Sequence, residues 1–555
     1  MSCLPNKSSG SEPSANIEIT DQSIVRSSTI NNDNLSQEVQ KDLDDNEILR
    51  KVAGPIPGSV WLVMLLSMAE RFSFYGMTAP FMNFMQNGPN DPLHPGALGW
   101  GQSRASEVSN VFFILSLLTP IGASLAADKS LGRYNVLCIT FAFYFMGAIL
   151  LLVSSLPSLA RVAAPVFIVS LFLIAVGMSG VNGLMAAFVS DQLPGENSTI
   201  VATKRGERVI IDRARTLESI YNIYYWSINV GGLAGLATTE LELHVGFWAA
   251  YLLPTSALVF SASILYLGKS RFTVVAAEST ALPNAAKVIW LGFRDGFSLD
   301  KAKESYQQRK HGRQVSWTDG FVEEVKKALA ACRMMYAAWP ILWICRGQVS
   351  NNLVSQAAQM QSSGVPNDMM YNTNPIVIII FIPIVDRILF PWLRRSGFAL
   401  TALTRLVCGF VLEALAMAMA AIVQHLIYSS GPCYEYPLSC IASNGGSIPN
   451  SVNIFLQVPI FALEAFSETL SSPAGYELAY TMAPSSMKSV LQALFSTTGA
   501  VGSSLSLALS PLYGDPYMVW VYSSLAIAMG TVTLIFYFVL VSGSESPDLG
   551  EKARV

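Results

Sequence analysis

The chain has 555 residues, of which 52% are hydrophobic and only 13% are charged, with a formal net charge of −3. Soluble domains carry about 25% charged residues, so this composition excludes a string of soluble domains and indicates a polytopic membrane protein. The slightly negative charge, and the lack of a basic patch with interleaved aromatic residues, give no support to nucleic-acid binding.

Residues 1–57 are polar and have no apolar core segment, which predicts a disordered tail and not a signal peptide. A bilayer-spanning helix needs about 20 mostly apolar residues. Twelve such runs follow, at approximately 58–85, 104–127, 134–156, 163–190, 217–239, 246–268, 336–361, 374–395, 399–426, 453–482, 486–511 and 516–542.

A long polar segment, residues 269–335, separates the sixth run from the seventh. It divides the spans into two six-helix bundles, 58–268 and 336–542, with a second tail at 543–555. The end of this segment, in residues 318–340, predicts an interfacial amphipathic helix that leads into the seventh span. The pattern as a whole predicts an all-α membrane protein, a transporter built as two bundles.

The charges of the short loops predict the orientation, because basic residues concentrate in cytoplasmic loops. One set of loops has Arg161 and almost no other basic residue. The alternate set carries Lys129, Arg133, Lys204, Arg205, Arg208, Arg213, Arg215, Arg394, Arg395 and Lys488. Both termini and the 269–335 linker are then cytoplasmic.

Two of the seven cysteines, Cys433 and Cys440, lie in a polar loop on the opposite, outer side. Oxidation is permitted there, so these two predict a disulfide. The four histidines lie in loops or at helix ends without metal-ligand spacing. We expect no metal and no cofactor.

The first apolar run contains the sequence MAERFSFYGM, with Glu70 beside Arg71 and no other ionisable side chain. Each such charge costs about 2.5–3.5 kcal/mol in a spanning helix, so the pair needs an explanation. One explanation is that Glu70 and Arg71 form a buried ion pair with a structural role. Residues at i and i+1 point about 100° apart on a helix, however, and we do not expect these two to face each other directly.

Several segments resemble known transporters. DKSLGR (128–133) resembles the loop between helices two and three of the major facilitator superfamily. ERFSFYG (70–76) resembles the helix-one motif of the proton-dependent oligopeptide transporter (POT, or PTR) family, and YNIYYWSINVGGL (221–233) resembles its helix-five signature. Further segments within 206–495 look like the fungal branch, and the resemblance covers about 49–511 in order. It implies the major facilitator fold, with twelve helices around a cavity that opens alternately to each side, and uptake of di- and tripeptides with protons.

The resemblance also implies roles for single residues. Arg71 matches the arginine that grips the peptide carboxylate, which suits the forked guanidinium. Glu70 matches a glutamate linked to proton coupling. Tyr75 lies one turn after Arg71 and can share its face of the helix. Asn229 matches the binding-site asparagine of helix five, and Glu468 matches the helix-ten carboxylate that receives the peptide amino group.

The chain departs from the family pattern at five positions, one of which is Phe74 in place of a frequent Tyr. Ser67 replaces the first Glu of the helix-one motif E-x-x-E-R, and Asn182 replaces the usual helix-four Lys. One anion and one cation are lost together, and neither replacement ionises near neutral pH. Glu464 and Arg346 are additional charges in the second half. We expect Arg346 to neutralise Glu464 and Glu468; the alternative is that these charges lie near a water-filled cavity without a specific role.

Three functions remain open. The first is proton-coupled transport of small peptides by alternating access. The second is transport of another small solute, such as an organic anion, nitrate or a secondary metabolite, with altered or absent proton coupling. The third is a nutrient sensor that binds but does not transport. We do not expect an enzyme, since P-loops, nucleophile elbows and metal spacings are absent from the sequence. The family resemblance implies the plasma membrane, with the vacuolar membrane as the alternative.

Overall fold

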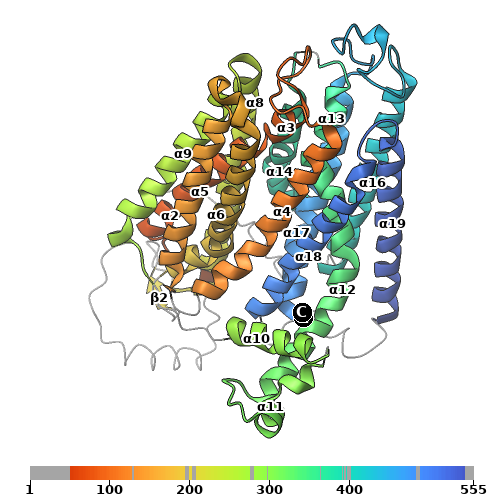
Figure 1. The fold of residues 1–555 in the computed structure, drawn as a ribbon. Coiled ribbons are helices and arrows are strands. Elements are labelled where there is room, and N and C mark those ends of the chain that lie inside the picture. Colours follow the sequence, from red (N-terminus) through yellow and green to blue (C-terminus); the bar gives the residue numbers. More distant parts are fainter. Residues whose placement is uncertain are drawn as a thin grey trace, which may run out of the picture. The chain divides into compact units, whose positions relative to one another are not determined.

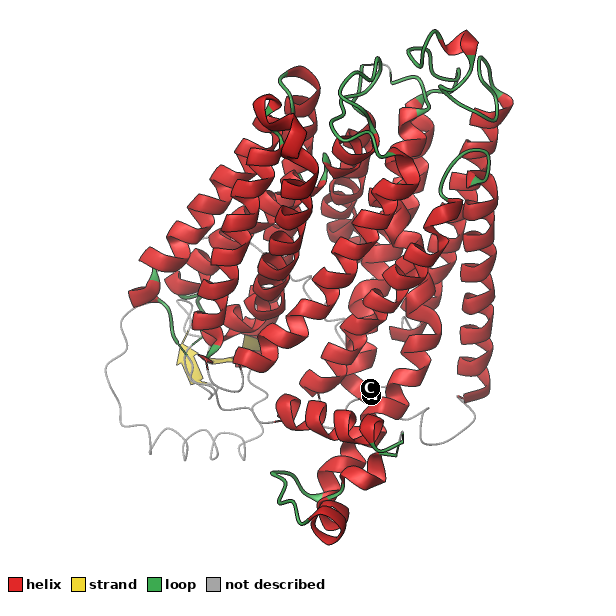
Figure 2. Ribbon diagram, in the orientation of Figure 1, coloured by secondary structure: helices red, strands yellow, loops and turns green. Residues whose placement is uncertain are grey.

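Figures 1 and 2 show the computed structural model of the chain, which is almost entirely helical. It describes residues 50–127, 131–193, 199–202, 208–274, 281–296, 298–362, 364–389, 392, 396, 402–482 and 488–543. Most of the two predicted tails lies outside the described residues. So do several basic loop residues used to predict the orientation: Lys129, Lys204, Arg205, Arg394 and Arg395.

The first half of the chain forms eight helices and two short 3-10 turns. They are α2 (Gly58–Thr78), α3 (Phe81–Gln86), α4 (Gly101–Ala126), α5 (Arg133–Ser154), η2 (Pro157–Val162), α6 (Ala163–Asp191), α7 (Arg213–Gly232), α8 (Ala234–His244), α9 (Phe247–Leu267) and η3 (Lys269–Arg271).

The second half begins inside a long helix that also contains the end of the linker. Its elements are α12 (Asp319–Ser350), α13 (Asn352–Ala358), η5 (Asn367–Asn372), α14 (Thr373–Ile384), the π-turn η6 (Val385–Leu389), α16 (Ala402–Ser429), η7 (Ile441–Ser443), η8 (Ile454–Gln457), α17 (Val458–Met482), α18 (Lys488–Leu509), η10 (Ser510–Leu512) and α19 (Met518–Gly543). Each of the twelve predicted runs contains one helix or two consecutive helices, so the fold prediction is confirmed.

Some spans are interrupted. Seven described helical segments are long and apolar enough to cross a membrane alone, and the bent pair 319–330 and 335–358 makes an eighth, with an angle of 48°. The first span breaks before Pro80, which has no backbone N–H to continue α2. The fifth span breaks at Leu233, directly after two glycines. Proline and glycine thus divide spans that the hydropathy pattern predicts to be continuous.

Three short strands lie outside the helices: β1 (Arg50–Val52), β2 (Thr199–Ala202) and β3 (Arg208–Ile211). β3 lies in the centre, parallel to β1 and antiparallel to β2. The chain forms two compact units, and this sheet belongs to the smaller one, which contains 1–57 and 194–219. β1 lies in the predicted disordered tail, and the sheet was not predicted. The β-branched residues of β3 give this strand a high strand propensity.

The linker is a packed structure with α10 (Ala281–Arg294), η4 (Leu299–Ala302) and α11 (Glu304–His311). The indole of Trp317 is buried and donates a hydrogen bond to the carbonyl of Ala302 at 3.0 Å. The amphipathic helix predicted over 318–340 is part of the continuous, bent α12. The helix α10 was not predicted.

Four partly exposed side chains tie η4 to the start of α12. Lys303 contacts Asp300 at 2.7 Å and Glu323 at 2.6 Å, and Lys326 contacts the same two carboxylates at 2.6 and 3.1 Å. Hydrogen bonds from Lys303 and Lys326 lower the pKa of Asp300 to about 2. The network therefore stays ionised at neutral pH, although solvent screens such exposed pairs.

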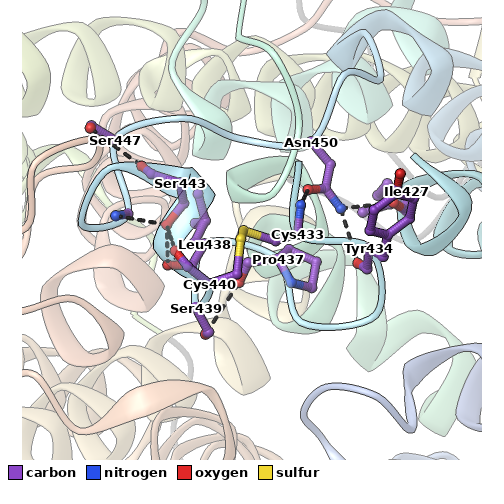
Figure 3. The surroundings of a disulfide bond; sticks show 11 residues. Ile427, Cys433, Tyr434, Pro437, Leu438, Ser439, Cys440, Ser443, Ser447 and Asn450 are labelled. Atoms are coloured by element: carbon purple, nitrogen blue, oxygen red, sulfur yellow. Dashed lines mark hydrogen bonds between the residues drawn. A yellow bond between two sulfur atoms is a disulfide. The ribbon is translucent and has the colours of Figure 1, made fainter. Parts of the chain in front are cut away.

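Cys433 and Cys440 form a disulfide in the loop 430–453 (Figure 3). Asn450 holds this loop together, since its amide donates to the carbonyl oxygens of Ile427 at 2.8 Å and Tyr434 at 3.0 Å. The backbone N–H of Asn450 also donates to the carbonyl of Gln359, just after α13. We call this end of the helices the disulfide end. α12 begins at the opposite end, which we call the linker end.

The two halves of the chain are hydrogen-bonded to each other at the disulfide end. Side-chain hydrogen bonds join residues 83–106 of the first half to residues 352–367 and 510–518 of the second half. Gln102, for example, donates to Asn352, and Ser103 donates to the carbonyl of Ser510. The structure is therefore closed between the halves at this end.

Candidate functional site

Glu70 and Arg71 bind each other directly within α2. Arg71 Nε donates to Glu70 Oε2 and Arg71 Nη2 donates to Glu70 Oε1, both at 2.7 Å. The two residues are only 2% and 6% exposed. The expectation that neighbours on a helix do not face each other was wrong here, because both side chains are long enough to turn their charged ends together along the helix surface. The guanidinium also lies 5.0 Å from the ring centre of Phe74.

The helix α7 approaches α2 closely beside this pair. A Cβ atom on Gly231 would lie 2.6 Å from the carbonyl oxygen of Met68 and 2.9 Å from Cβ of Arg71, so only glycine fits. Asn229, two residues earlier, is buried, and its amide donates to the carbonyl of Tyr225 at 2.9 Å. The glycine thus brings the Asn229 segment against Arg71, while the Asn229 amide is bonded within its own helix.

Tyr75 lies where the two halves meet. It interacts electrostatically with Arg71 of its own helix and with Glu464 and Glu468 of α17. A Cβ on Gly232 would lie 3.7 Å from the Tyr75 ring and 3.5 Å from Pro375, which belongs to α14 in the second half. The structure thus brings Arg71 and Tyr75 of one half near Glu464 and Glu468 of the other.

One amide joins Glu464 and Glu468 of α17. The Nδ2 atom of Asn374, at the start of α14, donates to Oε2 of Glu464 and lies 3.4 Å from Oε2 of Glu468. Glu464 is buried and Glu468 is half-buried. The sequence analysis did not identify Asn374, although it is the second residue of α14 and the first of its predicted run.

Arg346 of α12 binds hydroxyl groups instead of the glutamates. Its Nη1 donates to Ser472 at 3.0 Å and its Nη2 donates to Ser471 at 2.7 Å, both on α17. Its charge acts on Glu464 through space. The expected neutralisation of Glu464 and Glu468 is therefore not a direct ion pair among the described residues.

Ser67 and Asn182, which replace an ionisable Glu and Lys of the family pattern, form no ion pair among the residues that the structure describes. The Ser67 hydroxyl donates to the carbonyl of Val63 at 2.8 Å in the turn before it. Asn182 is exposed on α6. Within the described ranges, no cluster of three or more His, Cys, Asp or Glu side chains has the arrangement of a metal site.

Sequence reasoning missed three buried carboxylates. Glu413 of α16 is 0% exposed, and in the described part of the chain neither of its oxygens has a hydrogen-bond partner. It interrupts the predicted run 399–426 as Glu70 interrupts the first run, so the same signal was present. Glu242 and Asp368 lie at the disulfide end. The predicted fifth run stopped at residue 239, which left Glu242 outside the spans.

Interrupted apolar helices in two halves, with charged side chains from both halves converging between them, define a polytopic membrane transporter. A family model described as POT family matches residues 134–527, and the chain belongs to this family.

Relatives extend the match to most of the chain. It is 39% identical to the peptide transporter PTR_C of Candidozyma auris, over 91% of this chain and 87% of that protein. It is 36% identical to the peptide transporter PTR2 of Saccharomyces cerevisiae, over 87% and 79%. The crystal structure of the POT family transporter PepTSo shares the fold, with a TM-score of 0.69 at 19% identity, over 89% and 99% of the two chains.

Proposed function

We propose that this protein is a secondary transporter that moves di- and tripeptides by alternating access, coupled to protons. The observation that supports this most is the convergence of Arg71 from the first half with Glu464 and Glu468 from the second, around Tyr75. A guanidinium and a carboxylate on opposite sides suit the two ends of a zwitterionic peptide. The two relatives described above are named peptide transporters.

The direct Glu70–Arg71 pair suggests how solute and proton are linked. In the structure, Glu70 occupies two donors of the guanidinium that we assign to the peptide carboxylate. A proton on Glu70 removes that competing negative charge and frees Arg71 for the solute. Asn229 and Tyr75 would line the same site, and Glu468 would receive the amino group.

A non-peptide solute is the second candidate. Ser67 and Asn182 supply no charge, because neither side chain ionises near neutral pH. The Ser67 hydroxyl is bonded within its own helix, and Asn182 is exposed. The coupling chemistry of the helix-one and helix-four positions is therefore absent. An organic anion would use Arg71 and leave Glu468 without a cationic partner.

The test is solute uptake by the purified protein in proteoliposomes. We expect accumulation of a labelled dipeptide when an inward proton gradient is imposed, and competition by unlabelled di- and tripeptides but not by free amino acids. A protonophore, which collapses the gradient, should abolish accumulation and leave exchange intact. Competition by organic anions with no competition by peptides would contradict the peptide assignment.

We further propose that the disulfide end faces outward at the plasma membrane, with both termini and the linker in the cytoplasm. The domain division is then a tail to residue 57, bundles at 58–268 and 336–542, the linker 269–335 and a tail from 543. The boundary at 335 falls inside α12.

A thiol-labelling experiment tests the disulfide and its side together. In intact cells, a membrane-impermeant maleimide should label Cys433 and Cys440 only after treatment with an impermeant reductant. Mass spectrometry of the peptide that contains residues 431–441 identifies the labelled atoms. Labelling without reductant would contradict the disulfide, and labelling only after permeabilisation would reverse the orientation.

A further inference from the structure

We propose that Glu242 and Asp368 together form a proton-binding site whose occupation closes the disulfide end of the transporter. The proposal rests on the proposed function, because it assigns a gate and a proton site to the same transport cycle. It concerns residues distant from Arg71 and Glu468 and depends on neither of them.

The two carboxylates belong to different halves of the chain. Glu242 lies on α8 and Asp368 lies in η5. They are 3% and 1% exposed, they line the same small cavity, and their charges interact electrostatically. A contact of this kind can exist only while the two halves are together at this end.

An amide pair holds the carboxylates in place. Asn83 of α3 donates to Glu242 Oε1 at 3.0 Å and to Asn367 Oδ1 at 2.9 Å, and Asn367 donates back to Asn83 Oδ1 at 2.8 Å. Asn83 and Glu242 come from the first half, and Asn367 precedes Asp368 in the second. The amides therefore fix the relative position of the two acids across the boundary.

Three oxygen atoms of the pair lack a donor. Among the described residues, Glu242 Oε2 and both carboxylate oxygens of Asp368 are buried without a hydrogen-bond partner. Two ionised carboxylates in such a place repel each other, and each also loses its hydration. One shared proton converts the repulsion into a hydrogen bond between the two groups. A shared proton would satisfy both groups at this place.

The surrounding groups do not supply a cation. Glu240 and Tyr251 are the other titratable residues that interact electrostatically with the pair. Glu240 is directed to an exposed contact with His244 at 3.2 Å. In the part of the chain that the structure describes, no Lys or Arg forms a hydrogen bond with either acid.

His94 is a further titratable group of the region, and its backbone N–H donates to Asp91 Oδ1 at 2.9 Å. It lines the same small cavity as Glu242 and Asp368, and its Nε2 lies 2.8 Å from the carbonyl oxygen of Ala358 in the other half. Burial lowers the pKa of His94 below its ordinary value of 6.5. Its contribution to closure is therefore complete above pH 6.5 and is lost as the pH falls, which is opposite in sign to the effect of the acid pair.

The position of the pair connects protonation to transport. The hydrogen bonds between the halves lie at the disulfide end, so separation of Glu242 from Asp368 requires that this end opens. A proton taken up from that side favours the closed arrangement, and loss of the proton favours the open one. The pair thus supplies a protonatable site in a chain in which Ser67 and Asn182 have replaced two others.

Distance measurements on the full-length protein in nanodiscs, without solute, test the proposal. Spin labels are attached through an unnatural amino acid at Leu159 and Ile441, which are 37% and 100% exposed and lie on opposite halves. Between pH 7.5 and 5.5 we expect the closed population of the wild type to rise, by up to about tenfold in the closed-to-open ratio per pH unit for one bound proton. The Glu242→Gln/Asp368→Asn double variant should be closed at both pH values.

Three controls make the result specific. Glu240→Gln removes a neighbouring exposed acid and should keep the wild-type response. His94→Gln removes the opposing imidazole and should make the response steeper. Should the double variant fail to fold, Glu242→Gln alone serves the same purpose.

A double variant that retains the wild-type pH response would overturn the proposal, as would a wild type without any response. These outcomes are separate from the uptake assay. A pH response that disappears in the double variant supports the proton site even when no peptide is transported. Peptide accumulation by a protein without this response would leave the proposed function intact and refute the site.

Discussion

Arg71→Ala is expected to weaken solute binding by about 10–100-fold. A hydrogen bond to a charged group contributes about 1.5–3 kcal/mol, which corresponds to one to two orders of magnitude in Kd. Arg71→Lys should restore binding only in part, because an ammonium lacks the forked donors that bind both carboxylate oxygens. Equilibrium binding of a labelled dipeptide to the purified variants measures the effect.

Loss of the guanidinium also leaves Glu70 buried without its partner. Breaking a buried ion pair in this way costs about 3–5 kcal/mol in stability, so part of any lost binding in Arg71→Ala comes from the fold. The Glu70→Gln/Arg71→Ala double variant separates the two effects, since it removes the orphaned charge. We expect it to regain thermal stability without regaining affinity.

Arg161→Ala is a matched control, because Arg161 is an exposed arginine in η2. It should bind solute as the wild type does. Wild-type affinity in Arg71→Ala would show that the Glu70–Arg71 pair is structural.

Glu70→Gln is expected to abolish accumulation driven by a proton gradient while keeping counterflow exchange. Glutamine imitates a protonated glutamate and no longer competes for the Arg71 guanidinium with a negative charge. The transporter can then bind and exchange solute but can no longer couple it to a proton. Accumulation and counterflow are measured side by side in proteoliposomes, with Glu435→Gln, an exposed glutamate of the disulfide loop, as the control.

Other outcomes of this experiment identify a different proton site. Accumulation that survives in Glu70→Gln but fails in Glu464→Gln would place the coupling proton on α17, where Asn374 contacts Glu464 and Glu468. Equal wild-type transport with and without a gradient would mean that coupling was lost together with Ser67 and Asn182. The protein would then be a facilitator, and peptide symport would be refuted.

The sequence by itself determined the class of the protein and its helical plan. Runs of about 20 apolar residues must satisfy their backbone groups internally in a bilayer, so they are helices in whatever order they pack. Glu70 and Arg71 were singled out for a related reason, because a charge in such a run is costly. The site roles of Arg71 and Glu468 came from the family resemblance. The same rule applied to Glu413 and would have found it.

Only the tertiary structure decided which polar groups meet. The hydropathy pattern does not show where a polar side chain points or which residue of another helix it contacts. The bidentate Glu70–Arg71 contact depends on rotamers, and the link from Asn374 to Glu464 depends on how α14 packs against α17. Asp368 meets Glu242 because the segment before α14 returns to the first half, where a reciprocal amide pair holds it. Such contacts follow from long-range packing, which a local sequence pattern does not encode.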